Sequence, residues 1–305
     1  MSFFELHFHG AAGFRTGDLS RQAYERMSLY LAEHNVDGFL AAFSAMPHEL
    51  LLKSVSFAAA MCREPLSGAQ LKGIYLEGPY LAVAGAMSQD QLARPSTSKL
   101  EEVIHAAEGR IKIMTVAPEL PGILDAVRCA VDHNIVVAAG HTSCTAGELE
   151  KAVEAGVRHI THLGNNGEGD IICDRGQYRH DGPLLAMLND ERLTVEVICD
   201  GVHVPPELVN LFYRVVGKKR FAAVTDCCAA AGLAGQWLEL ANGAGEMDRF
   251  EVKNGALYTS DGGLTGSLIS ADKAAENLMN FANISWDDAC IAADALPRRI
   301  AGYDQ

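Results

Sequence analysis

Ile74-Tyr-Leu-Glu-Gly-Pro79 places one carboxylate, Glu77, at the end of a short apolar run that stops at Gly-Pro. This pattern is typical of a buried strand that delivers a charged side chain to the edge of a sheet. The same construction recurs in Glu5-Leu-His-Phe-His9, Val137-Ala-Ala-Gly-His141, Ile160-Thr-His162, Val197-Ile-Cys-Asp-Gly-Val-His203 and Ala223-Val-Thr-Asp226. Six predicted strand ends therefore carry side chains that can bind metals or transfer protons.

Strand-like and helix-like segments alternate along most of the chain. The predicted strands cover residues 3–9, 38–43, 71–76, 111–116, 135–139, 159–163, 194–198 and 221–225. The predicted helices cover residues 19–31, 47–62, 98–107, 121–133, 146–155, 183–188 and 206–215, and two more follow at 268–282 and 286–295. Strands that alternate with helices form parallel βαβ units, so a parallel α/β architecture is expected.

Eight such units close most naturally into a (β/α)8 TIM barrel, which needs about 250 residues. The alternative is an open doubly wound sheet, but that sheet would spread the six polar strand ends along one edge, whereas a closed barrel brings them together. Asn-Gly and Asp-Gly pairs at Asn242, Asn254 and Asp261 are typical of hairpin turns. The sequence therefore predicts a single (β/α)8 barrel domain of the metal-dependent hydrolase type over residues 1–305, with a β-hairpin insertion at about residues 236–263.

Composition and charge argue against several classes of protein. The formal net charge is −14, whereas a nucleic-acid-binding surface is basic. No apolar run approaches the roughly 18 residues of a membrane span, and the first residues lack the features of a signal peptide. The eight cysteines are scattered and form no Cys-x-x-Cys pair. We therefore expect a cytoplasmic protein that binds neither nucleic acid nor membrane.

The polar strand ends have the composition of a metal site. His7 and His9 alternate on one strand, so both rings point to the same face. Imidazole and carboxylate ligands suit a divalent ion, with zinc expected first and iron, manganese or cobalt as alternatives. Glu77 can bridge two ions while His141 and His162 complete the set, so either one or two ions are expected.

A hydrolytic metal site also needs a group that carries protons to and from an activated water. Asp226, at the end of the last predicted strand, is placed for this role. A histidine taken alone is more often a packing or surface residue than a ligand. The histidines that we interpret as structural or solvated are His34, His48, His105, His133, His159 and His180.

Six motifs, in this order, resemble those of the N-acetylglucosamine-6-phosphate deacetylases of the amidohydrolase superfamily. They are Leu76-Glu-Gly-Pro-Tyr80, Ala139-Gly-His-Thr142, Thr161-His-Leu163, Cys199-Asp-Gly-Val-His-Val204, Val224-Thr-Asp226 with Ala229-Ala-Ala-Gly232, and Leu264-Thr-Gly-Ser267. The resemblance runs from the first histidines to the tail.

The resemblance implies a role for each matching residue. Glu77, His141 and His162 would hold the catalytic metal, and His7 and His9 would offer a second position that some family members fill. Asp226 would be the general acid/base, and His203 would polarise the amide carbonyl or hold the sugar. The residues implied to contact the substrate are Asn165, Asn166, Arg179, Met87 and Leu264. A homodimer is implied too, because the family's phosphate-binding arginine crosses a dimer interface.

Departures from the family pattern concern the substrate pocket more than the reaction. Gly85-Ala86-Met87 replaces the usual Gly-Ala-His, and methionine cannot donate a hydrogen bond. Gly164-Asn-Asn-Gly167 replaces the usual Phe-Asn-Ala-Met, and the following loop to Arg179 is longer. The small β-sandwich that family members build from both termini is not expected here. The pattern indicates retained hydrolysis on an altered substrate.

The sequence thus favours a metal-dependent amidohydrolase that deacetylates an N-acetylated amino sugar, N-acetylglucosamine 6-phosphate or a close relative, to the amino sugar and acetate. One alternative is hydrolysis of a different N-acyl sugar, a cyclic amide or a phosphoester at the same metal site. Another is a non-catalytic sugar-binding relative, which predicts lost ligands that this chain retains.

Overall fold

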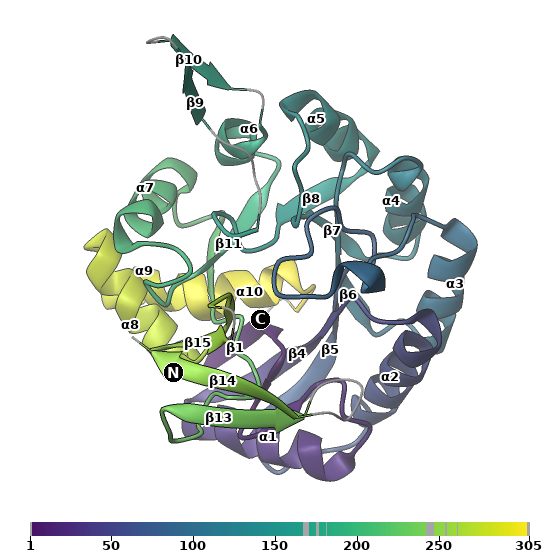
Figure 1. Cartoon of the computed structure of the whole chain (residues 1–305), viewed down its shortest axis with the longest axis vertical. Coiled ribbons are helices and arrows are strands. Elements are labelled where there is room, and N and C mark those ends of the chain that lie inside the picture. Colours follow the sequence, from purple (N-terminus) through teal and green to yellow (C-terminus); the bar gives the residue numbers. More distant parts are fainter. Residues whose placement is uncertain are drawn as a thin grey trace.

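The fold is a closed parallel barrel, described here from a computed structural model. The structure describes residues 2–166, 171–174, 177–180, 182–241, 247–253, 255–260 and 262–303. Eight strands form one sheet in the order β1-β4-β5-β6-β7-β8-β11-β12 (Figure 1). Their bounds are Phe3–Phe8 (β1), Val36–Ser44 (β4), Gln70–Glu77 (β5), Ile111–Val116 (β6), Val136–Ala139 (β7), Val157–Ile160 (β8), Thr194–Ile198 (β11) and Phe221–Val224 (β12).

All neighbouring strands in this sheet pair in parallel. The chain just beyond the last strand also meets the end of the first, because Phe8 and Cys227 form a parallel bridge and the backbone N–H groups of His9 and Gly10 donate to the carbonyl of Cys227 at 2.9 and 3.1 Å. The predicted (β/α)8 TIM barrel is confirmed, and the open sheet is excluded.

Helices follow the strands and cover the outside of the barrel (Figure 1). Their bounds are Arg21–Glu33 (α1), His48–Met61 (α2), Thr97–Ala106 (α3), Ile123–Asp132 (α4), Ala146–Ala155 (α5), Leu184–Asn189 (α6), Pro206–Val216 (α7) and Ala271–Ala282 (α8). Side-chain caps start three of them, since Ser20, Ser96 and Thr145 accept backbone N–H groups of α1, α3 and α5. Pro47, predicted inside the first turn of α2, is instead its N-cap. None of the helices in the described part of the chain has the length and hydropathy needed to cross a membrane.

The amino-terminal end of the barrel is filled by apolar side chains. Phe4, Leu6, Leu40, Ile113 and Tyr75 form one buried cluster with Leu296 and Ile300. The last two belong to α10 (Leu296–Ile300), which continues from α9 (Trp286–Cys290) through the π-helical segment η2 (Ile291–Ala295). The helix predicted over 286–295 is therefore too short, because its extension packs against the barrel interior. This end of the barrel is closed.

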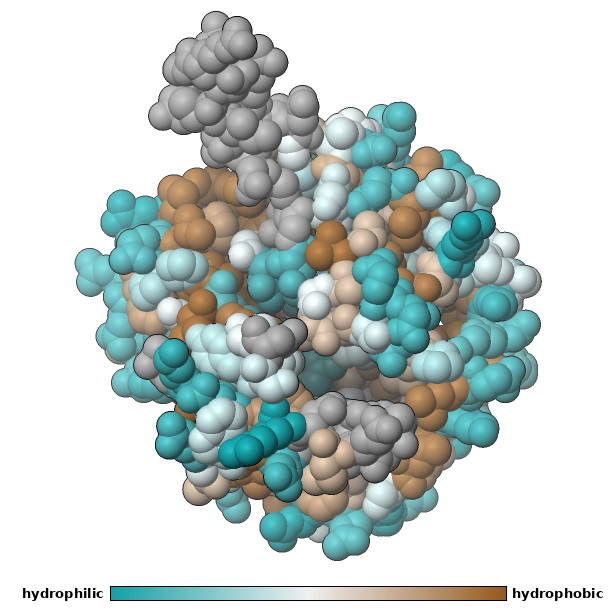
Figure 2. All heavy atoms as spheres, viewed as in Figure 1, coloured by the Kyte–Doolittle hydropathy of each residue, from teal (hydrophilic) through white to brown (hydrophobic). Residues whose placement is uncertain are grey.

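A small antiparallel sheet lies beside the carboxyl end of β12. Its strands are Trp237–Ala241 (β13), Met247–Lys253 (β14), Ala256–Thr259 (β15) and Leu264–Ser267 (β16). It occupies the region of the predicted insertion, although three of the predicted turn residues, Asn242, Asn254 and Asp261, lie outside the described residues. The face that carries this sheet is hollowed near its centre (Figure 2).

Three shorter elements complete the fold. They are the hairpin of β2 (Gly10–Ala11) and β3 (Phe14–Arg15), the hairpin of β9 (Ile171–Asp174) and β10 (Gln177–His180), and the 3-10 turn η1 (Gln89–Gln91).

Candidate metal centre

Three buried side chains from the ends of β5, β7 and β8 meet at the carboxyl end of the barrel. Glu77 is the last residue of β5, while His141 and His162 follow β7 and β8. Oε1 of Glu77 lies 2.9 Å from Nε2 of His141 and 2.9 Å from Nε2 of His162. Burial by itself raises the pKa of Glu77, but the two imidazoles outweigh it and hold that pKa well below its usual range. Glu77 is therefore a carboxylate.

His7 and His9 join this group from the end of β1. Their Nε2 atoms lie 3.0 Å apart, and Nε2 of His9 lies 3.3 Å from Oε2 of Glu77. Oδ1 of Asp226 lies 3.4 Å from Nε2 of His9 and 3.8 Å from Nε2 of His7. The structure thus brings together all five predicted ligands and the predicted proton carrier.

The donor set fits a divalent cation. The groups His7–His9–Glu77 and Glu77–His141–His162 each have donor atoms within 4.8 Å of one another, and Glu77 belongs to both. Burial lowers the pKa of His7, but Glu196, Asp226 and Glu77 raise it to about 10, so the surrounding carboxylates stabilise positive charge at this point. Imidazole nitrogen with carboxylate oxygen is a donor combination that zinc and iron accept.

The backbone turns sharply where the strands end. His141, His162 and Asp226 have φ values of 50°, 25° and 50°, in the left-handed region that residues other than glycine seldom adopt. Such conformations concentrate at functional sites, where the surrounding structure imposes them. Here the turn lets the ends of β7, β8 and β12 each direct a side chain toward one point.

The Nδ1 atoms of three buried histidines of this group, His141, His7 and His162, differ in their hydrogen-bond partners. Nδ1 of His141 lies 2.7 Å from the carbonyl of Val83, so Nδ1 carries a hydrogen, and in the neutral ring Nε2 keeps the lone pair that would bind an ion. Nδ1 of His7 lies 2.6 Å from Oε1 of Glu196. Nδ1 of His162 is buried and has no hydrogen-bond partner among the residues that the structure describes.

His203 is held by an aspartate that our sequence analysis did not select. Nδ1 of His203 lies 2.6 Å from Oδ2 of Asp200, whose Oδ1 accepts the backbone N–H groups of Val202 and His203 at 2.8 and 2.9 Å. Asp200 therefore fixes the ring of His203 with Nδ1 protonated. Its position three residues before His203 in the quoted motif was the available indication.

Two of the predicted substrate residues lie next to the histidines. Nδ2 of Asn166 lies 3.5 Å from Nε2 of His141, and the backbone N–H of Asn165 donates to the carbonyl of His162 at 3.1 Å. Gly85, at φ 60°, packs against Asn166, since an added Cβ would lie 2.7 Å from its Oδ1.

The positions of the other three predicted substrate residues, Met87, Leu264 and Arg179, are related to the metal centre less directly. Sδ of Met87 accepts the backbone N–H of Ala45 at 3.3 Å, just beyond β4. Leu264 begins β16, whose last residue, Ser267, donates its N–H to the carbonyl of Asp226 at 3.0 Å. Arg179 lies on β10, and its side chain is outside the described part of the structure.

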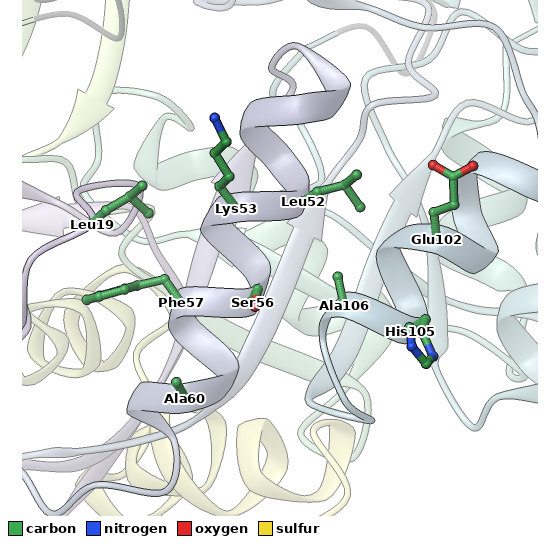
Figure 3. A pocket seen from close by; sticks show the side chains of 9 residues that line it. All are labelled: Leu19, Leu52, Lys53, Ser56, Phe57, Ala60, Glu102, His105 and Ala106. Atoms are coloured by element: carbon green, nitrogen blue, oxygen red, sulfur yellow. The ribbon is translucent and has the colours of Figure 1, made fainter.

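A groove elsewhere on the molecule contains none of these residues. It lies on the outside of the barrel between α2 and α3 (Figure 3). Its lining residues are Leu19, Leu52, Lys53, Ser56, Phe57, Ala60, Glu102, His105 and Ala106. Because α2 and α3 cover the outer face of the sheet, this groove is separate from the metal centre.

A closed parallel barrel with histidines and a glutamate at its carboxyl end is the architecture of the amidohydrolases. The chain is 30% identical over 309 residues to the N-acetylglucosamine-6-phosphate deacetylase of Bacillus subtilis (strain 168), an alignment that covers 99% of this chain and 75% of the relative. The chain belongs to the N-acetylglucosamine-6-phosphate deacetylase family.

Other relatives and solved structures agree with this assignment. The N-acetylgalactosamine-6-phosphate deacetylase of Escherichia coli O157:H7 is 27% identical over 305 residues, covering 99% of this chain and 78% of the relative. The crystal structure of the Mycobacterium smegmatis N-acetyl-D-glucosamine-6-phosphate deacetylase matches with a TM-score of 0.88 at 30% identity, covering 99% of this chain and 78% of that chain. The chain matches no protein-family model.

Proposed function

We propose that this protein is a metal-dependent deacetylase that hydrolyses the amide of an N-acetylated amino sugar 6-phosphate to the amino sugar phosphate and acetate. The observation that carries the proposal is the cluster of Glu77, His141 and His162 with His7, His9 and Asp226 at the carboxyl end of one barrel. The relatives act on two epimeric sugars by name, so N-acetylglucosamine 6-phosphate or its galactose isomer is the substrate.

One divalent ion would be held by Glu77, His141 and His162, and a second by Glu77 with His7 and His9. We expect zinc first, with iron, manganese or cobalt as alternatives. Such an ion polarises the amide carbonyl and acidifies water. Asp226 would accept the proton of the attacking water and return it to the amide nitrogen as the carbon–nitrogen bond breaks. His203, fixed by Asp200, would donate from Nε2 to the carbonyl oxygen or to a sugar hydroxyl.

We further propose a cytoplasmic homodimer of single-domain subunits, each a barrel with β13–β16 as an insertion. One face of α7 carries three exposed apolar side chains: Leu208 (38% exposed), Leu211 (49%) and Val215 (43%). Apolar side chains gather over α7 in the space-filling view (Figure 2). An exposed apolar face of this kind supports self-association. In the dimer, Arg179 of one subunit would reach the substrate phosphate of the other.

Acetate release tests the proposed activity directly. The protein, with its metal content counted, is offered N-acetylglucosamine 6-phosphate, N-acetylgalactosamine 6-phosphate and the two unphosphorylated sugars. We expect turnover of at least one phosphorylated sugar and a kcat/KM at least about tenfold lower without phosphate, since one charged hydrogen bond contributes roughly 1.5–3 kcal/mol. No acetate from any of the four by fully metallated protein would contradict the proposal.

Gly85→Ala is expected to raise KM for the substrate with a smaller change in kcat. The added methyl group would collide with the Asn166 side chain, displacing a residue proposed to contact the sugar phosphate. Loss of one such hydrogen bond is worth about 1 kcal/mol, or roughly a fivefold rise in KM. Steady-state kinetics of acetate release give both constants.

Gly122→Ala provides the matched control. Gly122 is also left-handed, at φ 83°, but an added Cβ there meets nothing within 4 Å. Both variants therefore carry the same kind of backbone strain, and only Gly85→Ala disturbs Asn166. Equal KM values in the two variants would show that Asn166 does not contact the substrate.

A further inference from the structure

Glu196 is a fully buried carboxylate in the middle of β11, beneath the metal centre. Its Oε1 lies 2.6 Å from Nδ1 of His7, and it accepts the Tyr75 hydroxyl and the backbone N–H of His162 at 3.2 Å each. Its Oε2 lies 3.1 Å from Nε2 of His159. Neither Glu196 nor His159 has an exposed side chain, and neither is used in the proposed reaction.

Stability alone is a weak reason for this arrangement. Removing a carboxylate from water costs several kcal/mol, and its ion pairs in the interior repay that cost only with good geometry. Apolar side chains of similar volume often give a protein that is equally stable. Two of the four contacts of Glu196 are instead with predicted metal ligands, His7 from β1 and the backbone of His162 after β8.

The contact with Glu196 determines which ring nitrogen of His7 carries the hydrogen. A carboxylate only accepts hydrogen bonds, so Nδ1 of His7 must carry a hydrogen. When His7 is a neutral ligand, its lone pair is therefore on Nε2, the nitrogen that lies 3.0 Å from Nε2 of His9. Tyr75, stacked on the His7 ring at 4.4 Å between centroids, restricts ring rotation.

His159 supports Glu196 from the opposite side. It contacts Oε2 of Glu196 through Nε2 and the hydroxyl of Thr194 through Nδ1 at 2.8 Å. With Oε2 engaged, Oε1 stays directed at His7. The sequence led us to interpret His159 as a structural or solvated residue. It did not reveal that His159 is linked to the metal centre through Glu196.

We propose that Glu196, supported by His159, is a positioning residue for the His7–His9 arm of the metal centre and sets the affinity of the second metal position. This inference rests on the two-position metal site of the proposed function. The Glu77–His141–His162 position depends on it less, because Glu196 contacts that group only through the backbone of His162. Mutation of a residue that hydrogen-bonds a metal ligand typically lowers metal affinity by 10–100-fold.

The test titrates metal-free protein with Co²⁺ and follows visible absorption and bound cobalt per chain. Glu196→Met keeps a similar volume but removes the acceptor, so we expect the affinity of the second position to fall about 10–100-fold and that of the first by less than about threefold. Glu196→Gln can still present an oxygen to His7, so its loss should be intermediate. A His9→Ala variant identifies which step of the titration belongs to the His7–His9 arm.

Glu119→Gln is the matched control. Glu119 is also a hydrogen-bonded carboxylate near a strand end, but its partners are the Thr142 hydroxyl and the backbone N–H of Ser143 at 2.6 Å. It should leave both steps unchanged. The inference would be overturned if both Glu196 variants weakened the two binding steps equally, or if both left the two steps unchanged. It would also be overturned if the wild type bound a single ion and the His9→Ala variant bound that ion equally well. The proposed deacetylation would survive those results, because acetate release tests it separately.

Discussion

Asp226→Asn is expected to abolish most turnover while leaving the bound metal in place. The substitution keeps the shape of the side chain beside His9 but removes the group that accepts and returns a proton. General acid–base catalysis typically contributes about 10²–10⁴-fold, so kcat should fall by that factor. The measurement is acetate release together with metal per chain. The five predicted ligands remain, so the metal content should equal that of the wild type.

Asp18→Asn is a suitable control for this result. Asp18 accepts the backbone N–H of Arg15 at 2.9 Å in the segment between β3 and α1, and within the described structure it has no hydrogen bond with a predicted ligand. Its replacement should change activity little. Wild-type kcat in Asp226→Asn would remove Asp226 from the mechanism, whereas a parallel loss of metal would make it a ligand instead.

Glu77→Gln is expected to remove both metal and activity. Glu77 is 5% exposed and lies between two imidazoles at 2.9 Å and a third at 3.3 Å, so its charge is shared by both candidate metal groups. A neutral amide of the same size cannot replace a carboxylate that belongs to both of the proposed metal positions. We expect metal affinity to fall beyond the 10–100-fold typical of outer partners, and kcat to become undetectable without added metal.

Metal analysis after dialysis and a rescue experiment test this expectation. The variant should lose its ions in dialysis, and excess Zn²⁺ should restore at most part of the activity. Glu119→Gln again supplies the same chemical change, at a carboxylate whose hydrogen bonds are with Thr142 and Ser143 and not with a ligand side chain. Full retention of metal by Glu77→Gln would exclude Glu77 from the centre and leave its contacts with the histidines as structural ones.

The predictable part of this protein is the part that its local sequence pattern determines. Ile111–Val116, Thr194–Ile198 and Ala146–Ala155 were predicted to the residue, because apolar runs and caps define them. Glu77 and the histidines were visible because each follows such a run, and a barrel collects strand ends on one side.

Contacts between residues far apart in the chain could not be predicted. The carbonyl that orients His141 belongs to Val83, 58 residues away, and the carboxylate that orients His7 is Glu196, 189 residues away. Glu196 had a visible indication, a lone charge inside the apolar run of β11, but no local pattern names its partners. The extension of the last helix into the barrel likewise depends on packing against Phe4 and Leu6.

The left-handed backbone at His141, His162 and Asp226 lowers the stability of the fold at positions where the proposed reaction needs these side chains. Each such residue costs about 1–3 kcal/mol, whereas glycine would adopt the same conformation without strain. Replacement by glycine would relax the chain and at the same time delete a proposed ligand or the proposed proton carrier. Selection for heat resistance alone would therefore favour inactive variants. A thermostable and active form must gain its stability elsewhere, on the outer helices rather than at the strand ends.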